Sequence, residues 1–534
     1  MRVTYRAPVF SADGVVATPH YLASLAGADA LRDGGSAVDA AIASNLVLCV
    51  VWPHMCGVGG DLFAQVWSPR DERLFGLNAS GRAGAAMSLA AYRARGLQAM
   101  PPRGPLSVTV PGAVSGWFAL HARWGRLDPG RLFRDAIHYA RDGFLISRIV
   151  SAAIRANVEL LSSLGGAAEI FLVEGGAPDI GDRLVQPDLA HTLERLAADG
   201  PGAMYGGWLG ERLAGCLGEH GGLLTLDDLR DHRADWVEPI QTDYGGARVC
   251  ELPPNTQGIT LLQMLNMLAP GEVAGWHIGN PKLVHQLVER KKLAFADRDA
   301  YVADPSQVEV PVEQLLDPVY ARERARQVGP QASDRAPGGP PVDGDTIYLC
   351  AADRDGMVVS LIQSLFSAWG SGVLVPGTGV TLQNRGYAFR LLDEHPNVLA
   401  PGKRPLHTLM PGLALRDDKP WLAFGTRGAD GQPQTCLQIL TNLLDFGLDP
   451  QAALEAPRWV HGAPGGRFPR DALVLEAAFG QPLADALSAR GHQVLLTEPL
   501  DLVMGTAQLI QVDQARGCYI GASDPRGDGV ALAV

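Results

Sequence analysis

Thr346 is the residue of this 534-residue chain whose position points most directly to covalent chemistry. It follows the run VGPQASDRAPGGPPVDG at 328–344, which is too rich in Pro, Gly, Asp and Ser to form a helix or strand. A threonine hydroxyl is a weak nucleophile unless a base accepts its proton. Cleavage of the Asp345–Thr346 bond would free an α-amine within reach of Thr346 Oγ1, and this amine can serve as the base. A strand that simply begins after a loop has the same local sequence, so both interpretations stand at this point.

The segments after this junction predict a β-hairpin. Residues 346–352 and 357–366 have strand character, and Asp353-Arg-Asp-Gly356 between them is a turn sequence. In such a hairpin the numbers of paired residues sum to about 709–711, so Thr346 faces residues 363–365. Ser364 is therefore expected within hydrogen-bond distance of Thr346.

Other segments predict the elements that surround this hairpin. Apolar residues recur at helical spacing from Pro19 to Val51, and Gly34-Gly35 divides the stretch into two helices. Ser36 and Asp39 occupy the positions of a capping box at the start of the second helix. The sequence further predicts a turn over 57–60, a strand over 62–67, and helices over 187–199 and 282–299.

Composition and missing signatures narrow the classes of function. The 45 basic and 57 acidic residues give a net charge of −12, which argues against a nucleic-acid partner. No secretory signal or membrane-spanning stretch is visible, so we expect no membrane partner and a cytoplasmic location. The seven cysteines lie far apart and suggest neither a disulfide framework nor a zinc site. The G-x-S-x-G, Walker A, G-x-G-x-x-G and H-E-x-x-H signatures do not occur.

Longer segments carry a family resemblance. The second half contains, in this order, GDTIYLCAADRDGMVVSLIQS, SGVLVPGTGVTLQNRG, GKRPLHTLMPGLAL, FGTRGADGQPQTCLQIL and YIGASDPRGDG. The first half contains ATPHYLASLAGADALRDGGSAVDAAIA, NASGRAG, VTVPGAVSGW and KLAFADRDAYVADP. In type and order, over nearly the whole chain, these segments resemble the γ-glutamyltransferase (γ-glutamyltranspeptidase) family of N-terminal nucleophile hydrolases.

The resemblance implies a proenzyme that cleaves itself between Asp345 and Thr346. The products would be a large subunit, residues 1–345, and a small subunit, residues 346–534, with 328–345 as a flexible processing linker. The implied fold class is α+β, an αββα sandwich built jointly by both subunits as one intertwined domain. The subunits are expected to stay together as a heterodimer, or as a dimer of such heterodimers. No metal and no organic cofactor is implied.

The resemblance also implies roles for individual residues. Thr346 would be the nucleophile and, through its amine, the base, with Ser364 supporting its hydroxyl. The backbone N–H groups of Gly428 and Ala429 would stabilise the oxyanion. Arg82 would bind the substrate's α-carboxylate.

Departures from the family pattern concern recognition of the substrate. Arg385 and Ala388 stand where γ-glutamyl-specific members carry an amide and an acid that bind the α-amino group. His407 and Thr408 replace a serine pair, and Phe366 replaces an asparagine. Arg385 and His407 are expected to add positive character, so the pocket should favour an anionic acyl group without an amine, or a bulkier one.

The sequence therefore predicts an autoprocessed threonine hydrolase or acyltransferase that cleaves an amide through an acyl-Thr346 intermediate. Its substrate would be a small amide or γ-glutamyl-type compound, and the acyl group would pass to water or to an amine. An amidohydrolase or acylase on a non-glutamyl substrate, of the oxamate or cephalosporin type, is the alternative. An unprocessed homologue that only binds is a third possibility, of a different class.

Overall fold

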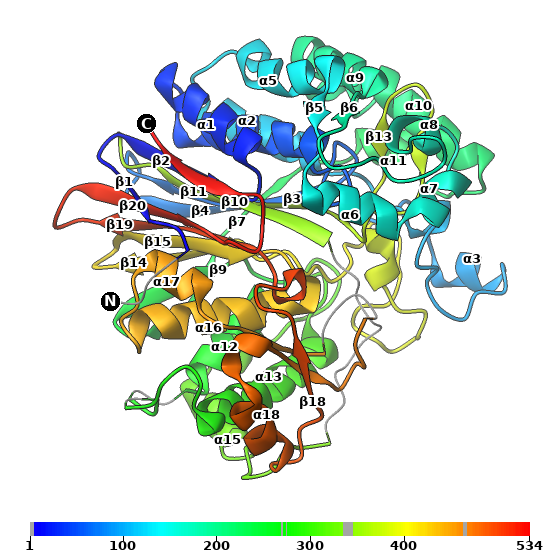
Figure 1. Ribbon diagram of the computed structural model, residues 1–534. Helices are drawn as coiled ribbons and strands as arrows, with labels where there is room; N and C mark the ends of the chain where they lie inside the picture. Colours follow the sequence, from blue (N-terminus) through cyan, green and yellow to red (C-terminus); the bar gives the residue numbers. More distant parts are fainter. Residues whose placement is uncertain (1–4, 269–270, 274, 335–344, 463–466) are drawn as a thin grey trace.

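Two seven-stranded antiparallel sheets stack face to face at the centre of the molecule, and helices cover both outer faces (Figure 1). This computed structural model describes residues 5–268, 271–273, 275–334, 345–462 and 467–534. In spatial order the first sheet contains β21 (Val530–Ala533), β2 (Gly14–Thr18), β10 (Asp345–Asp353), β11 (Val358–Phe366), β3 (Asp61–Ser68), β4 (Arg73–Ala79) and β7 (Asp235–Val237). The second contains β1 (Val9–Ser11), β20 (Cys518–Ser523), β19 (Ala507–Asp513), β15 (Lys419–Thr426), β14 (Gly412–Arg416), β9 (Ala247–Glu251) and β8 (Ile240–Tyr244). This arrangement confirms the predicted α+β class.

Each sheet has its own layer of helices. The first sheet is covered by α1 (Tyr21–Arg32), α2 (Ala37–Val51) and α4 (Ala113–Trp124), with α5 (Pro129–Asp142) and α9 (Pro187–Asp199) outside them. The second is covered by α12 (Gly258–Asn266), α16 (Gln432–Leu444) and α17 (Pro450–Glu455), and α13 (Pro281–Tyr301) packs on α12. None of the described helices is both long and apolar enough to cross a membrane.

Smaller elements surround these layers. A third sheet joins β16 (Trp459–His461), β17 (Leu473–Glu476) and β18 (Val494–Thr497), beside α18 (Gln481–Ser488). The others are α3 (Leu89–Arg93), α6 (Arg148–Ala156), α7 (Val158–Ser163), α8 (Ala167–Phe171), α10 (Trp208–Glu219), α11 (Leu226–Arg230), α14 (Val312–Leu315), α15 (Pro318–Ala325), β5 (Phe144–Leu145), β6 (Arg183–Leu184), β12 (Leu374–Val375) and β13 (Val380–Thr381).

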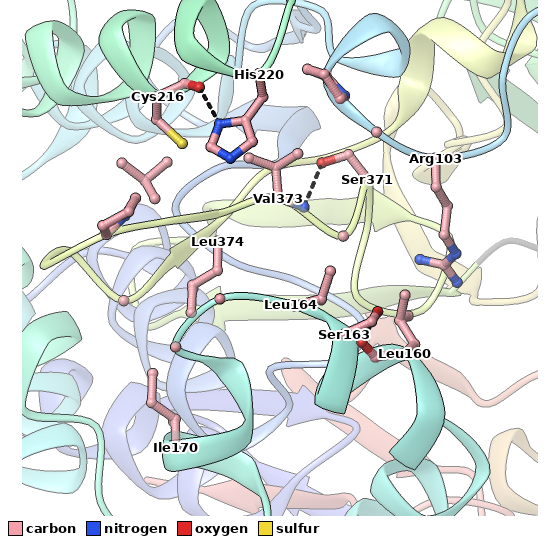
Figure 2. A pocket seen from close by; sticks show the side chains of 18 of the residues that line it. Arg103, Leu160, Ser163, Leu164, Ile170, Cys216, His220, Ser371, Val373 and Leu374 are labelled. Carbon is pink, nitrogen blue, oxygen red and sulfur yellow. Dashed lines mark hydrogen bonds between the residues drawn. The ribbon is translucent and has the colours of Figure 1, made fainter.

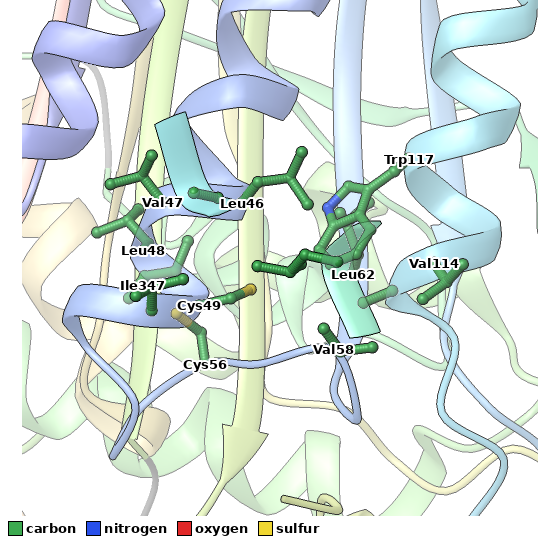
Figure 3. Close-up of a cluster of buried hydrophobic side chains, with 14 of the residues drawn as sticks. Leu46, Val47, Leu48, Cys49, Cys56, Val58, Leu62, Val114, Trp117 and Ile347 are labelled. Atoms are coloured by element: carbon green, nitrogen blue, oxygen red, sulfur yellow. The ribbon is translucent and has the colours of Figure 1, made fainter. Parts of the chain in front are cut away.

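Helix α2 anchors the first sheet because all 15 of its residues are buried. A helix that is apolar on every side is typical of such a buried position. Its predicted capping box is confirmed, since Ser36 accepts from the Asp39 N–H and Asp39 accepts from the Ser36 N–H. Figure 3 shows the resulting core, in which side chains of α2 lie near Leu62 of β3 and Ile347 of β10. The residue after Thr346 is thus fixed in this core.

The predicted hairpin of β10 and β11 is confirmed, and its side chains alternate between two cores. Ile347 and Leu349 face the α2 side, whereas Tyr348 and Cys350 face the second sheet. Because side chains of a strand alternate, Thr346 belongs on the face that looks toward the second sheet.

The remaining predicted elements are also present. The strand over 62–67 lies within β3, and the helices over 187–199 and 282–299 correspond to α9 and α13. The turn over 57–60 is closed by a 3.0 Å bond from Gly60 N to Gly57 O. Of the predicted linker, residues 328–334 form a loop, and 335–344 lie outside the described residues.

Contact between the two sheets leads to a stability prediction. A Cβ added to Gly425 of β15 would lie 2.4 Å from the ring of Tyr348 in β10. We expect Gly425→Ala to destabilise the protein by about 1–3 kcal/mol, because the sheets must move apart. The matched control is Gly215→Ala on the exposed side of α10, where no atom lies within 4 Å. That variant should be neutral or more stable by about 0.5–1 kcal/mol in thermal unfolding. Equal midpoints for the two variants would contradict the prediction.

Candidate active site

Thr346 lies at a bulge in the hairpin. Asp345 pairs with Phe366 and Ile347 pairs with Gln363, so two residues of β11 oppose Thr346 alone. Bulges of this kind redirect side chains at the ends of paired strands. Thr346 Oγ1 donates to Ser364 Oγ at 3.3 Å, and both residues are buried. The expected proximity of Thr346 and Ser364 is therefore observed.

The backbone after Ser364 supports this contact. Ser364 Oγ accepts from the N–H of Phe366 at 2.7 Å, which orients the hydroxyl. Phe366 has a φ of 79°, a conformation unusual for any residue with a side chain. Asn384 holds the next residue, because its Oδ1 accepts from Ser367 N at 3.0 Å.

Arg385 brings a buried cation to this group. Its guanidinium lies 3.8 Å from the centre of the Phe366 ring, and its Nη1 donates to Thr408 Oγ1 at 3.1 Å. Burial lowers the pKa of Arg385 to about 9, although the carboxylate of Asp61 opposes this shift. Arg385 is still protonated at neutral pH. Among the described residues, its Nε and Nη2 have no hydrogen-bond partner.

His407 lies deeper, between Asp61 and Phe63. Its Nδ1 accepts from Leu409 N at 3.3 Å, so Nε2 carries the proton and donates to Asp61 Oδ2 at 3.2 Å. Burial, with the charges of Arg385 and Arg404, holds the pKa of His407 well below its ordinary value. The prediction that His407 adds positive character is wrong, because the imidazole is neutral in this setting.

Arg82 makes a different contact from the one its predicted role suggests. Its Nη2 lies 2.8 Å from Asp235 Oδ2, and Asp235 also pairs with Arg404. The Arg82 side chain is 31% exposed. Within the described contacts its guanidinium meets Asp235 and none of the residues around Thr346. Its role as a carboxylate clamp therefore stays a prediction.

The Gly428–Ala429 turn follows β15 and leads through a short 3-10 helix, Ala429–Gly431, into α16. Gly428 has a φ of 122° and Ala429 a φ of 45°, and neither N–H donates to an acceptor among the described residues. Free N–H groups at the beginning of a helix favour a negative charge. The turn thus has the donors that an oxyanion requires.

Two residues beneath this turn were not found from the sequence. Gln257 Nε2 donates to Ala429 O at 2.9 Å and to Thr408 O at 2.8 Å. Arg298 Nη1 donates to Gln257 Oε1 at 2.8 Å. Arg298 belongs to the KLAFADRDAYVADP segment. This segment contributes to the family resemblance, but the resemblance implies no role for Arg298.

Ala388 lines a cleft of about 30 Å³ together with Phe366 and Thr408. This position therefore contributes no carboxylate to the cleft. The cleft is also lined by Asp299 and Asp430, and both carboxylates pair with Arg298. A larger cavity of about 630 Å³ lies elsewhere, between Leu160, Leu164 and Leu374, and Figure 2 shows its largely apolar lining. None of the predicted site residues lines it.

His285, Glu289 and His492 are the one group of the described residues whose geometry could suit a metal ion, with ligand atoms within 4.8 Å of one another. The two imidazoles bond each other at 2.8 Å, and Lys292 bonds Glu289 at 2.7 Å. Since the ammonium already neutralises the carboxylate, we assign no metal to this group.

Comparison with known proteins identifies the family. A model described as gamma-glutamyltranspeptidase matches residues 23–534. The chain belongs to the γ-glutamyltranspeptidase family. It is an enzyme of this family, a hydrolase proenzyme, as the resemblance implied.

Relatives of this family member cover nearly its whole length. The glutathione hydrolase-like YwrD proenzyme of Bacillus subtilis (strain 168) is 40% identical over 521 residues, 97% of this chain and 98% of the relative. The oxamate amidohydrolase proenzyme of Klebsiella pneumoniae is 39% identical over 527 residues, 98% of each chain. The crystal structure of cephalosporin acylase from Bacillus halodurans has a TM-score of 0.92 at 38% identity, and it covers 100% of this chain and 98% of that one.

The environment of Asp61 leads to a pH prediction. Burial raises the pKa of Asp61 from 3.8 to about 7, although Arg385 and the N–H groups of Gly81 and Gly112 oppose this. The folded state thus binds the proton more tightly, which stabilises it below about pH 4, and this gain is lost as pH rises to about 7. The free energy of unfolding of wild type minus that of Asp61→Asn should fall by about 1.4 kcal/mol per pH unit across this interval. Denaturant titrations between pH 4 and 8 measure it, and a constant difference would contradict it.

Proposed function

We propose that this family member is an N-terminal threonine hydrolase that cleaves itself before Thr346 and then hydrolyses an amide. The contact of Thr346 Oγ1 with Ser364 Oγ carries the proposal, because it places a supported hydroxyl at the end of the predicted processing linker. The products are a large subunit, 1–345, and a small subunit, 346–534.

Self-cleavage begins when Thr346 Oγ1 attacks the carbonyl carbon of Asp345. The peptide C–N bond breaks as an ester forms at Oγ1, and the nitrogen receives the proton that Oγ1 gives up. Water then hydrolyses the ester, which leaves a carboxylate on Asp345 and a free α-amine on Thr346.

The mature site repeats this chemistry on a substrate. The α-amine takes the proton of Oγ1, Oγ1 attacks the amide carbon, and the leaving amine receives the proton. The N–H groups of Gly428 and Ala429 stabilise the negative oxygen in both acylation and deacylation. Water, activated by the same amine, releases the acid and restores Thr346.

The interleaved strands support a joint fold. Strands β10 and β11 of the small-subunit segment lie between β2 and β3 of the large-subunit segment. The two pieces would therefore stay together as a heterodimer in an αββα sandwich after cleavage, since they share one sheet and its cores.

We further propose that the acyl group of the substrate carries a carboxylate and no α-amino group. Arg385 offers buried N–H groups to a carboxylate. Ala388 offers no acid to an ammonium, and the two carboxylates that line the same cleft, Asp299 and Asp430, already pair with Arg298. The name of one similar protein, oxamate amidohydrolase, agrees with such a substrate, because oxamate carries a carboxylate and no α-amino group. A γ-glutamyl hydrolase or transferase is the second candidate, because another relative is named a glutathione hydrolase-like proenzyme.

Processing is tested by electrophoresis under denaturing conditions. Wild-type protein should give two bands, the smaller with the N-terminal sequence Thr-Ile-Tyr-Leu-Cys, whereas Thr346→Ala should remain one chain without hydrolase activity. Ser364→Ala should cleave more slowly, because Oγ1 loses its hydrogen-bond partner. Active wild-type protein that stays as one uncut chain would refute the mechanism.

Substrate choice is tested with matched anilides. Glutaryl-p-nitroanilide and γ-glutamyl-p-nitroanilide differ at the α-carbon by the amino group alone, so their kcat/KM ratio reports recognition of the ammonium. We expect the glutaryl compound to be favoured by about tenfold or more, since one charge-assisted bond contributes about 1.5–3 kcal/mol. Arg385→Gln should lower kcat/KM for both compounds, because both carry the carboxylate that the guanidinium is proposed to bind. A preference of wild type for the γ-glutamyl compound would favour the second candidate.

A further inference from the structure

We propose that Gln257 and Arg298 are positioning residues that hold the Gly428–Ala429 turn in the conformation that stabilises the oxyanion. The inference rests on the proposed function of that turn. Both residues belong to the large-subunit segment, whereas the turn belongs to the small-subunit segment.

The side-chain amide of Gln257 links the turn to Thr408 and Arg298 through three hydrogen bonds. Its Nε2 donates to two carbonyls, Ala429 O at 2.9 Å and Thr408 O at 2.8 Å. Its Oε1 accepts from Arg298 Nη1 at 2.8 Å. Gln257 is completely buried, so water does not replace a lost bond. A glutamate cannot donate to either carbonyl, and an apolar side chain makes none of these bonds.

Arg298 fixes the other side of the turn. Its Nη1 also donates to Asp430 Oδ1 at 2.6 Å, and its guanidinium lies 4.2 Å from the Phe295 ring centre. Burial opposes its charge, but the carboxylates of Asp299 and Asp430 outweigh this and raise the pKa of Arg298. The guanidinium is therefore a permanent cation that orients both Gln257 and Asp430.

The turn needs such support because its backbone is strained. Ala429 has a φ of 45°, a region that disfavours residues with a Cβ. The peptide group before Ala429 is held by a 2.6 Å bond from Gly431 N to Gly428 O, and the one after it by Gln257. Holding both groups fixes the direction of the Ala429 N–H. Thr408, whose hydroxyl meets Arg385, is tied to the same amide, so the oxyanion turn and the acid-binding group keep a constant separation.

The test compares Gln257→Leu with Gln263→Leu. Gln263 is a matched control, because it is also buried, lies in the adjoining helix α12, and donates to a carboxylate of α13, Asp297, at 3.1 Å. Each variant is purified, its cleaved fraction is measured, and kcat and KM for glutaryl-p-nitroanilide are expressed per cleaved chain. Gln257→Glu serves as a second variant that keeps the size and a partner for Arg298.

We expect both Gln257 variants to lose about 10- to 100-fold in kcat, with KM changed less than about twofold, because the turn contacts the transition state. Gln263→Leu should keep kcat within about twofold of wild type, even if its thermal midpoint falls as far as those of the Gln257 variants. Wild-type kcat in the Gln257 variants, or an equal kcat loss in Gln263→Leu, would overturn the inference. Thr346→Ala separates the two proposals: if it retains turnover the proposed function fails, and if it is inactive the result for Gln257 decides this inference alone.

Discussion

Burial of β10 on every side is the constraint on which the rest of the structure depends. The strand is paired with β2 and β11, its odd-numbered side chains enter the α2 core, and its even-numbered ones meet the second sheet. Thr346 is therefore rigidly placed, and Tyr348, two residues further on, packs against Gly425 near the end of β15, just before the Gly428–Ala429 turn. Because the proposed nucleophile and the proposed oxyanion donors follow from strands of facing sheets, the packing of Tyr348 on Gly425 controls the separation of the strands that lead to them.

Buried charge distinguishes the candidate site. Moving a guanidinium out of water is costly unless other groups compensate for the lost hydration. Arg385 has the Phe366 ring, the Thr408 hydroxyl and the field of Asp61, yet two of its nitrogens have no partner within the described part of the chain. A carboxylate of the proposed substrate would accept hydrogen bonds from these two nitrogens. The sequence suggested a positive charge for both His407 and Arg385, but His407 is neutral, so of these two residues Arg385 carries the charge.

The sequence predicted what depends on local pattern. The hairpin, the proximity of Thr346 and Ser364, and the capped helix α2 all follow from turn residues, strand pairing or spacing, and all are found in the structure. The bulge at Thr346 was not predicted, because a single irregular pair leaves no signature in composition. Gln257 also escaped notice, since its partners lie 151 and 172 positions away and no local rule links them. The charge state of His407 depends on complete burial against Phe63, which only the packed fold reveals.

The division of the candidate site between sheet strands and a short connecting helix has an evolutionary consequence. Thr346 and Ser364 lie on paired strands within the cores, where most substitutions disturb folding, whereas Ala388 lies beyond them and lines the cleft. Ala388 ends a short 3-10 helix, Arg385–Ala388, and a mutation there changes the charge that an incoming molecule meets without altering the strands that hold the hydroxyls. One scaffold can therefore change substrates through mutations at a few positions outside the strands. Directed evolution toward a new acyl group should begin at the short helix that ends at Ala388 rather than in the sheet.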